Sequence, residues 1–180
     1  MTLSDAILLV NTPGLKLDAA TDWADLGFGR GLFTKALATV LAPGSSIFAI
    51  DTNPGLTNQE TKNKVKIITK KNDFVKDQLS MPLLDGILMA NSLHYVQDQP
   101  GFIRKISKLL KDTGCFIIIE YDTDMANRWV PYPLSFPTLI SLFQKEGFAK
   151  HRLINSVPSV YQAARIYSVW FPSCEGGERA

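Results

Sequence analysis

Three glycines at alternate positions, in the stretch Asp25-Leu-Gly-Phe-Gly-Arg-Gly31, are the residues from which a chemistry can first be inferred. They follow a short apolar run and precede a segment of helical periodicity. Glycine tolerates positive φ angles and lets another molecule approach the main chain closely. The first N–H groups of a helix, together with the positive end of its dipole, favour an anionic group. The stretch therefore predicts a loop shaped around a ligand.

The spacing of these glycines separates the classes of nucleotide-binding loop. A dinucleotide loop has the pattern G-x-G-x-x-G/A, but Leu32 stands where its third small residue would be, and Gly31 falls one position early. A phosphate loop of the nucleoside-triphosphatase type needs Gly-Lys-Ser/Thr after the glycines, and this sequence has none there. The spacing disfavours NAD and makes ATP a poor candidate.

An α/β sheet must position this loop. Short apolar runs predict strands over 23–26, 46–51, 65–69, 86–90 and 115–121, and stretches of helical period over 33–41, 102–110 and 135–146 predict helices between and after them. Two further β-like runs, 151–157 and 164–171, predict an antiparallel hairpin. We expect a doubly wound, mostly parallel, seven-stranded α/β sheet with helices on both faces and an antiparallel C-terminal hairpin.

Composition and length bound the remaining possibilities. The chain has 180 residues, enough for one domain, and we expect a short segment over 1–19, the domain over 20–172 and a flexible tail over 173–180. A net charge of +2 does not argue for a nucleic-acid partner. Cys115 and Cys174 lack the number and spacing of a disulfide framework or zinc site. With no secretory signal and no apolar run of membrane-spanning length, the prediction is a cytoplasmic protein without a membrane partner.

Further segments extend the pattern of the glycine loop. FAIDTN puts Asp51 at the end of the second predicted strand, KKNDF follows the third, and LKDTG precedes the fifth. Together with the D-x-G-x-G-x-G loop, these segments resemble the class I (Rossmann-like) S-adenosylmethionine (SAM)-dependent methyltransferases, in particular a small single-domain bacterial-type member. The resemblance covers roughly residues 20 to 171.

The resemblance implies SAM as cofactor and suggests its binding residues. Asp51 would hold the ribose hydroxyls, Asp73 would accept the adenine amino group with Phe74 along the ring, and the glycine loop would surround the methionine part. Asp25 would bond to loop amides behind the residues that touch the cofactor. The full expected set is Asp25, Gly27, Phe28, Gly29, Gly31, Asp51, Thr52, Asp73, Phe74 and Asn91.

Candidates for chemistry follow the fourth and fifth predicted strands, namely Asn91, Ser92, His94 and Tyr95 after the fourth and Glu120, Tyr121, Asp122 and Asp124 after the fifth. His94 is the first choice as a general base by its pKa, with Tyr121 and Asp122 next. The alternative is that His94 caps its strand or packs under the cofactor. Methyl transfer releases a neutral thioether, and orientation alone can supply ~7–11 kcal/mol, so a base is not obligatory. No metal site is expected, although Glu120, Asp122, Asp124 and His94 are its conceivable ligands.

Residues 127–136 are rich in aromatics and proline and follow the fifth strand. Trp129 and Tyr132, with His94, would contact a small-molecule acceptor, or else the two aromatic residues close the core. Lysines near the third strand, at 62, 64, 66, 70 and 71, fit a protected edge strand better than a nucleic-acid stripe. The expected activity is methyl transfer to a small molecule, and the alternatives are an RNA or protein methyltransferase or a non-catalytic SAM-binding subunit. Because few residues precede the first strand, we expect a pocket that is either open or completed by a second copy in a homodimer.

Overall fold

The computed structural model describes residues 1–15, 18–159 and 164–173. Cys174, the hairpin connection at 160–163 and nearly all of the expected tail lie outside this range. The helices are α1 (Leu3–Val10), α2 (Leu32–Val40), α3 (Gln99–Ser107) and α4 (Phe136–Lys145), with a 3-10 turn η1 (Leu93–Tyr95). The strands are β1 (Asp22–Leu26), β2 (Ser46–Asp51), β3 (Gln59–Glu60), β4 (Lys66–Lys71), β5 (Leu84–Ala90), β6 (Leu110–Tyr121), β7 (Arg152–Pro158) and β8 (Arg165–Pro172).

All of these strands form one sheet in the order β3-β4-β2-β1-β5-β6-β8-β7. The strands β4, β2, β1, β5 and β6 run parallel, whereas β8 pairs antiparallel with β6 and β7 antiparallel with β8. The strand order grows outward from β1 in both directions. A switch of this kind leaves a crevice at the carboxyl ends of the two strands beside it, here β1 and β5.

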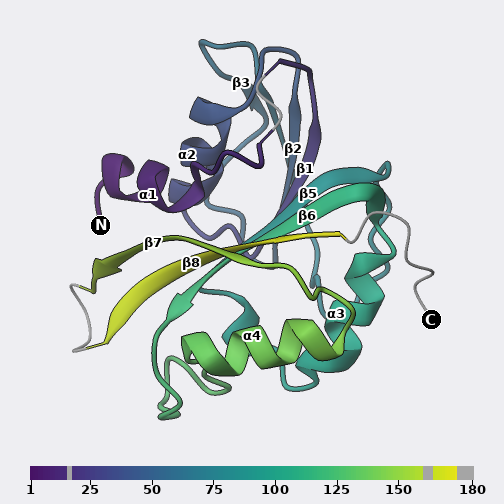
Figure 1. Cartoon of the computed structure of the whole chain (residues 1–180). Helices are drawn as coiled ribbons and strands as arrows, with labels where there is room; N and C mark the ends of the chain where they lie inside the picture. The colour runs from purple at the N-terminus through teal and green to yellow at the C-terminus, as the bar shows by residue number, and fades with distance from the viewer. Residues whose placement is uncertain (16–17, 160–163, 174–180) are drawn as a thin grey trace.

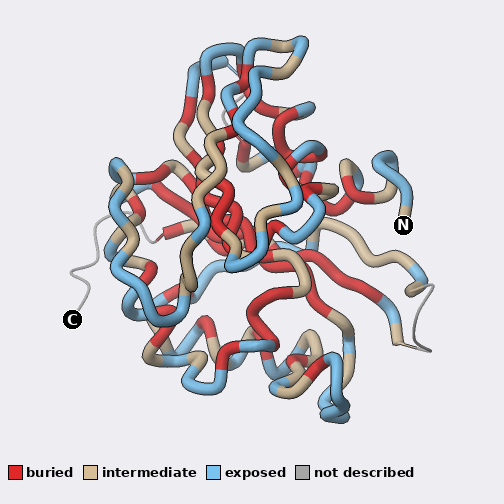
Figure 2. The backbone as a smooth tube through the Cα atoms, turned by 180° about the vertical axis from the view of Figure 1, so that it is seen from behind, coloured by how far each residue is buried: buried red, intermediate tan, exposed pale blue. Residues whose placement is uncertain are grey.

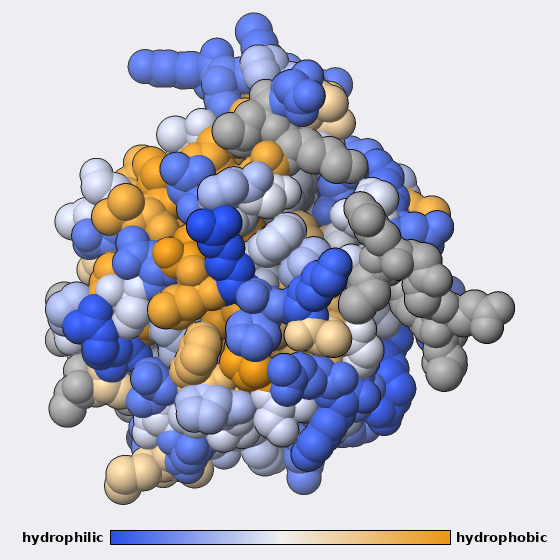
Figure 3. Space-filling view, viewed as in Figure 1, coloured by the Kyte–Doolittle hydropathy of each residue, from blue (hydrophilic) through white to orange (hydrophobic). Residues whose placement is uncertain are grey.

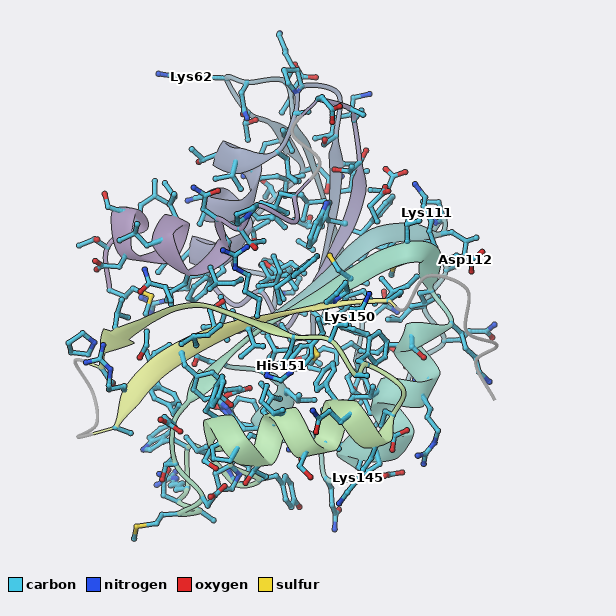
Figure 4. The ribbon with its side chains drawn as sticks, in the orientation of Figure 1. Lys62, Lys111, Asp112, Lys145, Lys150 and His151 are labelled. Atoms are coloured by element: carbon cyan, nitrogen blue, oxygen red, sulfur yellow. The ribbon has the colours of Figure 1, made fainter. Side chains whose placement is uncertain are left out.

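The predicted fold class is confirmed, with one strand more than the seven expected. The additional strand is β3, whose two residues pair antiparallel with Lys66 and Ile67 at the edge of β4. Two exposed residues carry no apolar pattern, which is why periodicity did not predict it. The lysines were expected to protect β4 as an edge strand, but β3 lies outside it and pairs with its first two residues. Lys62, just before β4, extends away from the ribbon (Figure 4).

Helices cover both faces of the sheet (Figure 1). Alternate strand residues face opposite sides, so the buried residues fall into two clusters. One cluster contains Leu26 of β1 with Phe102 of α3 and Phe143 of α4, and the other contains Trp23 of β1 with Leu9 of α1 and Leu37 of α2. The central strands are buried along most of their length (Figure 2), as strands with both faces covered should be.

Helix α1 was not predicted from the sequence. A capping box starts it, in which the Thr2 hydroxyl accepts a hydrogen bond from the Asp5 N–H at 3.2 Å and the Asp5 carboxylate accepts one from the Thr2 N–H at 2.9 Å. Leu9 is fully buried against the α2 side of the core, and its carbonyl accepts a hydrogen bond from Ser168 of β8. Hydrophobic side chains gather over this helix (Figure 3), where Leu8 is 53% exposed.

The turn LKDTG also differs from expectation, because α3 ends at Ser107 and β6 already begins at Leu110. The pairing passes from Leu84 opposite Leu110 directly to Gly86 opposite Cys115, so the intervening residues of β6 bulge out. A Cβ at Gly114 would lie 2.9 Å from the Lys111 carbonyl oxygen, which explains the glycine. In the described part of the chain, every helix is too short or too polar to cross a membrane.

Candidate active site

The glycine loop lies at the carboxyl end of β1, beside the switch in strand order. Its glycines all have positive φ, at 83° for Gly27, 54° for Gly29 and 77° for Gly31. A Cβ at Gly27 would clash with Ser92, and one at Gly31 would clash with Leu56. A Cβ at Gly29 would have no atom within 4 Å. Gly27 and Gly31 therefore serve close packing, whereas Gly29 borders open space.

Helix α2 starts directly behind this loop, with Gly31 as its N-cap residue. Gly31 has no side chain that could accept a hydrogen bond at this cap. The first N–H groups of the helix are therefore available to a ligand, and the positive end of the helix dipole lies beside them. This arrangement favours an anionic group such as a carboxylate.

Asp51, at the end of β2, reaches across to the same loop. Its Oδ2 accepts a hydrogen bond from the Gly29 N–H at 2.9 Å, and its Oδ1 accepts one from the Asn53 N–H at 2.8 Å. The Gly55 N–H in turn donates to the Gly29 carbonyl at 3.1 Å. Each carboxylate oxygen has a second lone pair, so Asp51 can still accept hydrogen bonds from a ligand. Thr52 follows it in an exposed position.

Asp25 is fully buried behind the loop, between β1 and α2. The Thr34 hydroxyl of α2 donates to its Oδ2 at 2.6 Å, so its partner is a side chain and not the expected loop amides. Among the described residues its Oδ1 has no hydrogen-bond partner. Burial raises the pKa of Asp25 to about 7, against the lowering effect of the Thr34 hydrogen bond and with a smaller contribution from the charge of Asp51.

The side chain of Phe28 departs from the expected site. It is only 6% exposed and packs in the core cluster on the α2 side. An apolar side chain between two glycines of the loop is better placed under the loop than in it, because burial stabilises the chain. Only the main chain of Phe28 can therefore contribute to the site.

Asp73 and Phe74 follow β4. The Asp73 carboxylate accepts hydrogen bonds from the N–H groups of Val75 at 3.0 Å and Lys76 at 3.2 Å, which makes it the cap of a short turn. Desolvation opposes its ionisation, but those N–H groups and the Lys76 ammonium outweigh this effect and hold the pKa of Asp73 below its usual value. The Phe74 ring packs 5.8 Å from the Phe102 ring, centroid to centroid, and borders the Cβ position of Gly27.

A cavity of about 820 Å³ opens next to this crevice. Its lining comes from the residue after β5, the turn η1, the end of β6 and the loop after it, namely Asn91, His94, Tyr95, Tyr121, Asn127, Arg128, Trp129 and Val130. Ser92, next to Asn91, donates its hydroxyl to the Leu26 carbonyl at 2.6 Å and so joins this wall to the glycine loop. Asn91 has a φ of 53°, and its buried Oδ1 has no partner in the described part of the chain.

His94 and Glu120 form a buried pair in the wall of this cavity. Nδ1 of His94 lies 2.5 Å from Oε2 of Glu120, and the His94 N–H donates to Oε1 at 3.2 Å. The side chains are 2% and 1% exposed. Sequence reasoning named Glu120 as a candidate after the fifth strand and as a conceivable metal ligand, but not as the partner of His94. Glu120 is the one charged residue in the apolar run CFIIIEY, which is a signal for a partnered acid. Sequence reasoning also placed Tyr95 among the candidates after the fourth strand, and it did not single out Asn127 or Arg128 within the segment 127–136.

The other residues expected to act on a substrate separate into two groups. Tyr121 and Trp129 line the cavity, and Trp129 is 68% exposed with the Arg128 guanidinium 5.4 Å from its ring centroid. Tyr132 is not among the lining residues, and its N–H donates to the His94 carbonyl at 3.0 Å. Asp122 is likewise outside the lining, because its carboxylate accepts a hydrogen bond from the Phe136 N–H at the start of α4 at 2.8 Å.

Asp124, like Asp122, accepts hydrogen bonds from groups at the start of α4. Its Oδ1 accepts hydrogen bonds from the Ser135 N–H at 3.0 Å and the Thr138 hydroxyl at 2.9 Å. These bonds, from Ser135 above all, hold the pKa of Asp124 below its usual value. In the ranges that the structure describes, no three or more His, Cys, Asp or Glu side chains gather in a group able to hold a metal ion.

Comparison with known proteins agrees with this geometry. Residues 4–151 match the family model described as a methyltransferase domain. Among solved structures, a 1,6-didemethyltoxoflavin N1-methyltransferase of Burkholderia thailandensis, with bound S-adenosylhomocysteine, superposes with a TM-score of 0.67 at 18% identity over 95% of this chain and 77% of that one. A SAM-dependent methyltransferase of Aquifex aeolicus gives 0.62 at 17% identity, over 97% and 100% of the two chains.

A third solved structure, an arsenic(III) SAM methyltransferase of Chlamydomonas reinhardtii, gives a TM-score of 0.64 at 15% identity, over 95% of this chain and 72% of that one. No curated protein is a significant sequence match. At these identities the superpositions establish the shared fold, and the family model is the independent evidence at the level of sequence.

Proposed function

Because this chain belongs to the methyltransferase-domain family, we propose that it transfers a methyl group from SAM to a small-molecule acceptor by in-line displacement. One observation supports the proposal. Three features lie together beside the switch in strand order between β1 and β5: the glycine loop with positive φ angles, a carboxylate at the end of β2 and a cavity lined by aromatic rings. Ligands of open α/β sheets bind at this place.

The residues present fit SAM. When bound, SAM supplies a methyl group on a positively charged sulfur. Gly29 borders open space that a side chain would fill, and the uncapped start of α2 offers N–H groups to a carboxylate. Asp51 retains lone pairs for two ribose hydroxyls while its main-chain bonds hold it in place. Asp73 and Phe74 would serve the adenine, Phe74 from its position beside Gly27.

A small acceptor is favoured by the size and the lining of the cavity. Its volume of about 820 Å³ and its aromatic walls are typical of sites for small organic molecules. Two of the superposed enzymes are named for small acceptors, 1,6-didemethyltoxoflavin and arsenic(III). The chain's own contribution is to orient the acceptor and exclude water, since orientation can supply ~7–11 kcal/mol of the barrier.

A thermal-shift comparison of SAM, S-adenosylhomocysteine, NAD and ATP tests the proposal without knowledge of the acceptor. SAM and S-adenosylhomocysteine should raise the melting temperature in a concentration-dependent manner, because a ligand that binds only the folded state stabilises it. NAD and ATP should leave it unchanged. A shift with NAD or ATP in place of SAM would contradict the proposed cofactor.

A further inference from the structure

Arg128 supplies the permanent charge of the cavity. In the part of the chain that the structure describes, it is the only lysine or arginine in the lining, and the lining contains no aspartate or glutamate. The other polar groups there are two asparagine amides, two tyrosine hydroxyls, the Trp129 indole and the His94 ring. An arginine guanidinium is always positively charged in proteins. The cavity therefore combines apolar walls with one fixed positive charge.

A tight turn holds the main chain of Arg128 in place. Asn127 and Val130 form an antiparallel bridge around it, in which the Asn127 N–H donates to the Val130 carbonyl at 3.1 Å and the Val130 N–H to the Asn127 carbonyl at 3.2 Å. The Asn127 Oδ1 also accepts hydrogen bonds from the N–H groups of Trp129 at 2.8 Å and Val130 at 3.1 Å. Because Val130 is only 1% exposed, the turn is anchored in the core.

The rest of the loop is tied to the opposite wall of the cavity. The segment between β6 and α4 extends away from the sheet (Figure 1). The Tyr132 N–H donates to the His94 carbonyl at 3.0 Å, and Nε2 of Gln99 donates to the Tyr132 carbonyl at 2.9 Å. These bonds connect the loop to η1 and to the start of α3. The position of Arg128 at the cavity is therefore set before any ligand binds.

The guanidinium of Arg128 has donors to spare. It lies over the Trp129 ring, with Cζ 5.4 Å from the ring centroid. A ring face attracts the cation but is a poor hydrogen-bond acceptor, so the five N–H groups are left for a ligand or for water. The ion pairs between described residues all involve other side chains. A molecule that fills the cavity and displaces water must therefore offer these N–H groups an acceptor.

The acidic residues nearest to Arg128 in the sequence have other partners. Glu120 is buried against His94. Asp122 and Asp124 accept hydrogen bonds from groups at the start of α4. The negative charge that would balance the guanidinium is thus left for a bound molecule to supply.

We infer that the methyl acceptor carries a carboxylate, and that Arg128 binds this carboxylate and so determines which small molecules the cavity accepts. The inference rests on the proposed function and deepens it. The planar fork of a guanidinium matches the two oxygens of a carboxylate in a pair of parallel N–H···O bonds. Water weakens an exposed ion pair. Here Trp129 covers one side of the guanidinium, and a ligand in the cavity would cover another.

A carboxylate fits this cavity better than a phosphate group does. A phosphate monoester carries between one and a half and two negative charges near neutral pH. The cavity offers a single guanidinium, and Asp122 and Asp124 lie in the same loop, where they repel additional negative charge. A singly charged group is therefore the closer match.

Two probes of nearly equal shape test the inference, namely cyclohexanecarboxylate and its uncharged primary amide. Both are small compared with a cavity of about 820 Å³, and the carboxylate is ionised near neutral pH. Saturation-transfer NMR titrations without SAM give the dissociation constant of each probe. In the wild type the carboxylate should bind at least about tenfold more tightly than the amide, because hydrogen bonds between charged groups are the stronger kind.

Two substitutions of Arg128 separate charge from geometry. Arg128→Gln removes the charge and should reduce the preference for the carboxylate to less than about twofold. Its melting temperature should stay near that of the wild type, because the Arg128 side chain is exposed. Arg128→Lys restores the charge without the planar fork, so it should recover only part of the preference. No binding of the carboxylate, equal affinity for both probes in the wild type, or a preference kept in Arg128→Gln would each overturn the inference.

The matched control is Arg152→Gln. Arg152 is an exposed arginine at the start of β7 and lines a different cavity together with Lys150, which Figure 4 labels. Its substitution makes the same change in charge and should leave the preference for the carboxylate unchanged. A preference that is lost in Arg152→Gln would locate the anion in that other cavity and would contradict the role of Arg128.

A third probe, cyclohexyl phosphate, distinguishes the two kinds of anion. It should bind no more tightly than the carboxylate, and tighter binding would refute the choice of a carboxylate. Since all of these titrations omit SAM, their result is independent of the thermal-shift test. A carboxylate preference that depends on Arg128, without a thermal shift by SAM, would refute the proposed cofactor and leave the anion site standing. A shift by SAM without this preference would do the reverse.

Discussion

The carboxylate of Asp51 accepts a hydrogen bond from the main-chain N–H of Gly29 at 2.9 Å, although Gly29 lies in the loop after β1 and Asp51 is the last residue of β2. The middle glycine of the loop after β1 is thereby tied to the end of β2. Its φ of 54° and its open surroundings leave its main chain accessible. One carboxylate thus both shapes the glycine loop and faces the crevice in which the cofactor is proposed to bind.

Asp51→Ala is expected to lower the affinity for SAM tens-fold or more, measured by titration calorimetry. The reason is that a charge-assisted hydrogen bond contributes roughly 1.5–3 kcal/mol, and Asp51 would make two to the ribose. Asp5→Ala is the control, because Asp5 also accepts main-chain hydrogen bonds but caps the surface helix α1. Equal SAM affinity in Asp51→Ala and the wild type would sink the site assignment.

Gly31→Ala should destabilise the fold by strain and by a clash, measured by urea unfolding. A φ of 77° costs an L-residue about 1–2 kcal/mol, and overpacking against Leu56 adds roughly 1–3 kcal/mol. Gly44→Ala is the matched control, since its φ is 87° but the nearest atom to the new Cβ lies 3.5 Å away. In a Leu56→Ala background the excess cost at Gly31 should disappear. If it remains, Leu56 does not set the requirement for glycine.

The stability of the protein should fall as the pH rises from about 4 to about 7 because of Asp25. Its pKa is raised from the ordinary 3.8 to about 7, so the folded state holds this proton more tightly than the unfolded chain. The contribution of Asp25 to the free energy of unfolding is fully present below pH 3.8 and is lost as the pH rises through about 7. Three pKa units correspond to a maximum of about 4 kcal/mol.

Urea unfolding of Asp25→Asn across this pH range checks that prediction. The variant should lose most of the slope, because the replacement side chain does not titrate. The Thr34 hydroxyl donates to Asp25 and thereby lowers the pKa of this carboxyl. Thr34→Val removes the hydroxyl, so the loss of stability should extend to higher pH. A slope of wild-type size in Asp25→Asn would show that another group carries the pH dependence.

Asp124→Ala should destabilise the start of helix α4 by about 1 kcal/mol, because the Ser135 N–H and the Thr138 hydroxyl lose their acceptor to solvent. Asp124→Asn keeps an acceptor oxygen and should cost less. Since the pKa of Asp124 is lowered in the folded state, its contribution should be present above its unfolded value of 3.8 and decline as the pH falls below it. Thermal unfolding near neutral pH and in acid measures both effects. Equal melting temperatures of Asp124→Ala and wild type would contradict the capping role.

Local sequence pattern was enough to predict most of the elements. Apolar runs bounded by turn residues predicted β2 over its observed bounds and the other main strands within two residues, except β6, which begins at Leu110 and not at 115. A buried strand needs little beyond its own sequence. The antiparallel hairpin followed from two such runs too close together for a crossover helix. Helix α1 was missed because a capped helix of eight residues depends on the α2 side of the core against which it packs.

The sequence by itself determined that a glycine loop, a carboxylate after β2 and an acidic-aromatic pair after β4 stand at strand ends, since those positions are set by local chain direction. Only the tertiary structure decided which of these groups meet. Strand register brought Glu120 to His94 across 26 residues, whereas the helix α4 took up Asp122 and Asp124 as acceptors for its first turn. The core took the Phe28 side chain. Pairing across a sheet depends on strand order and register, which a single sequence does not encode locally.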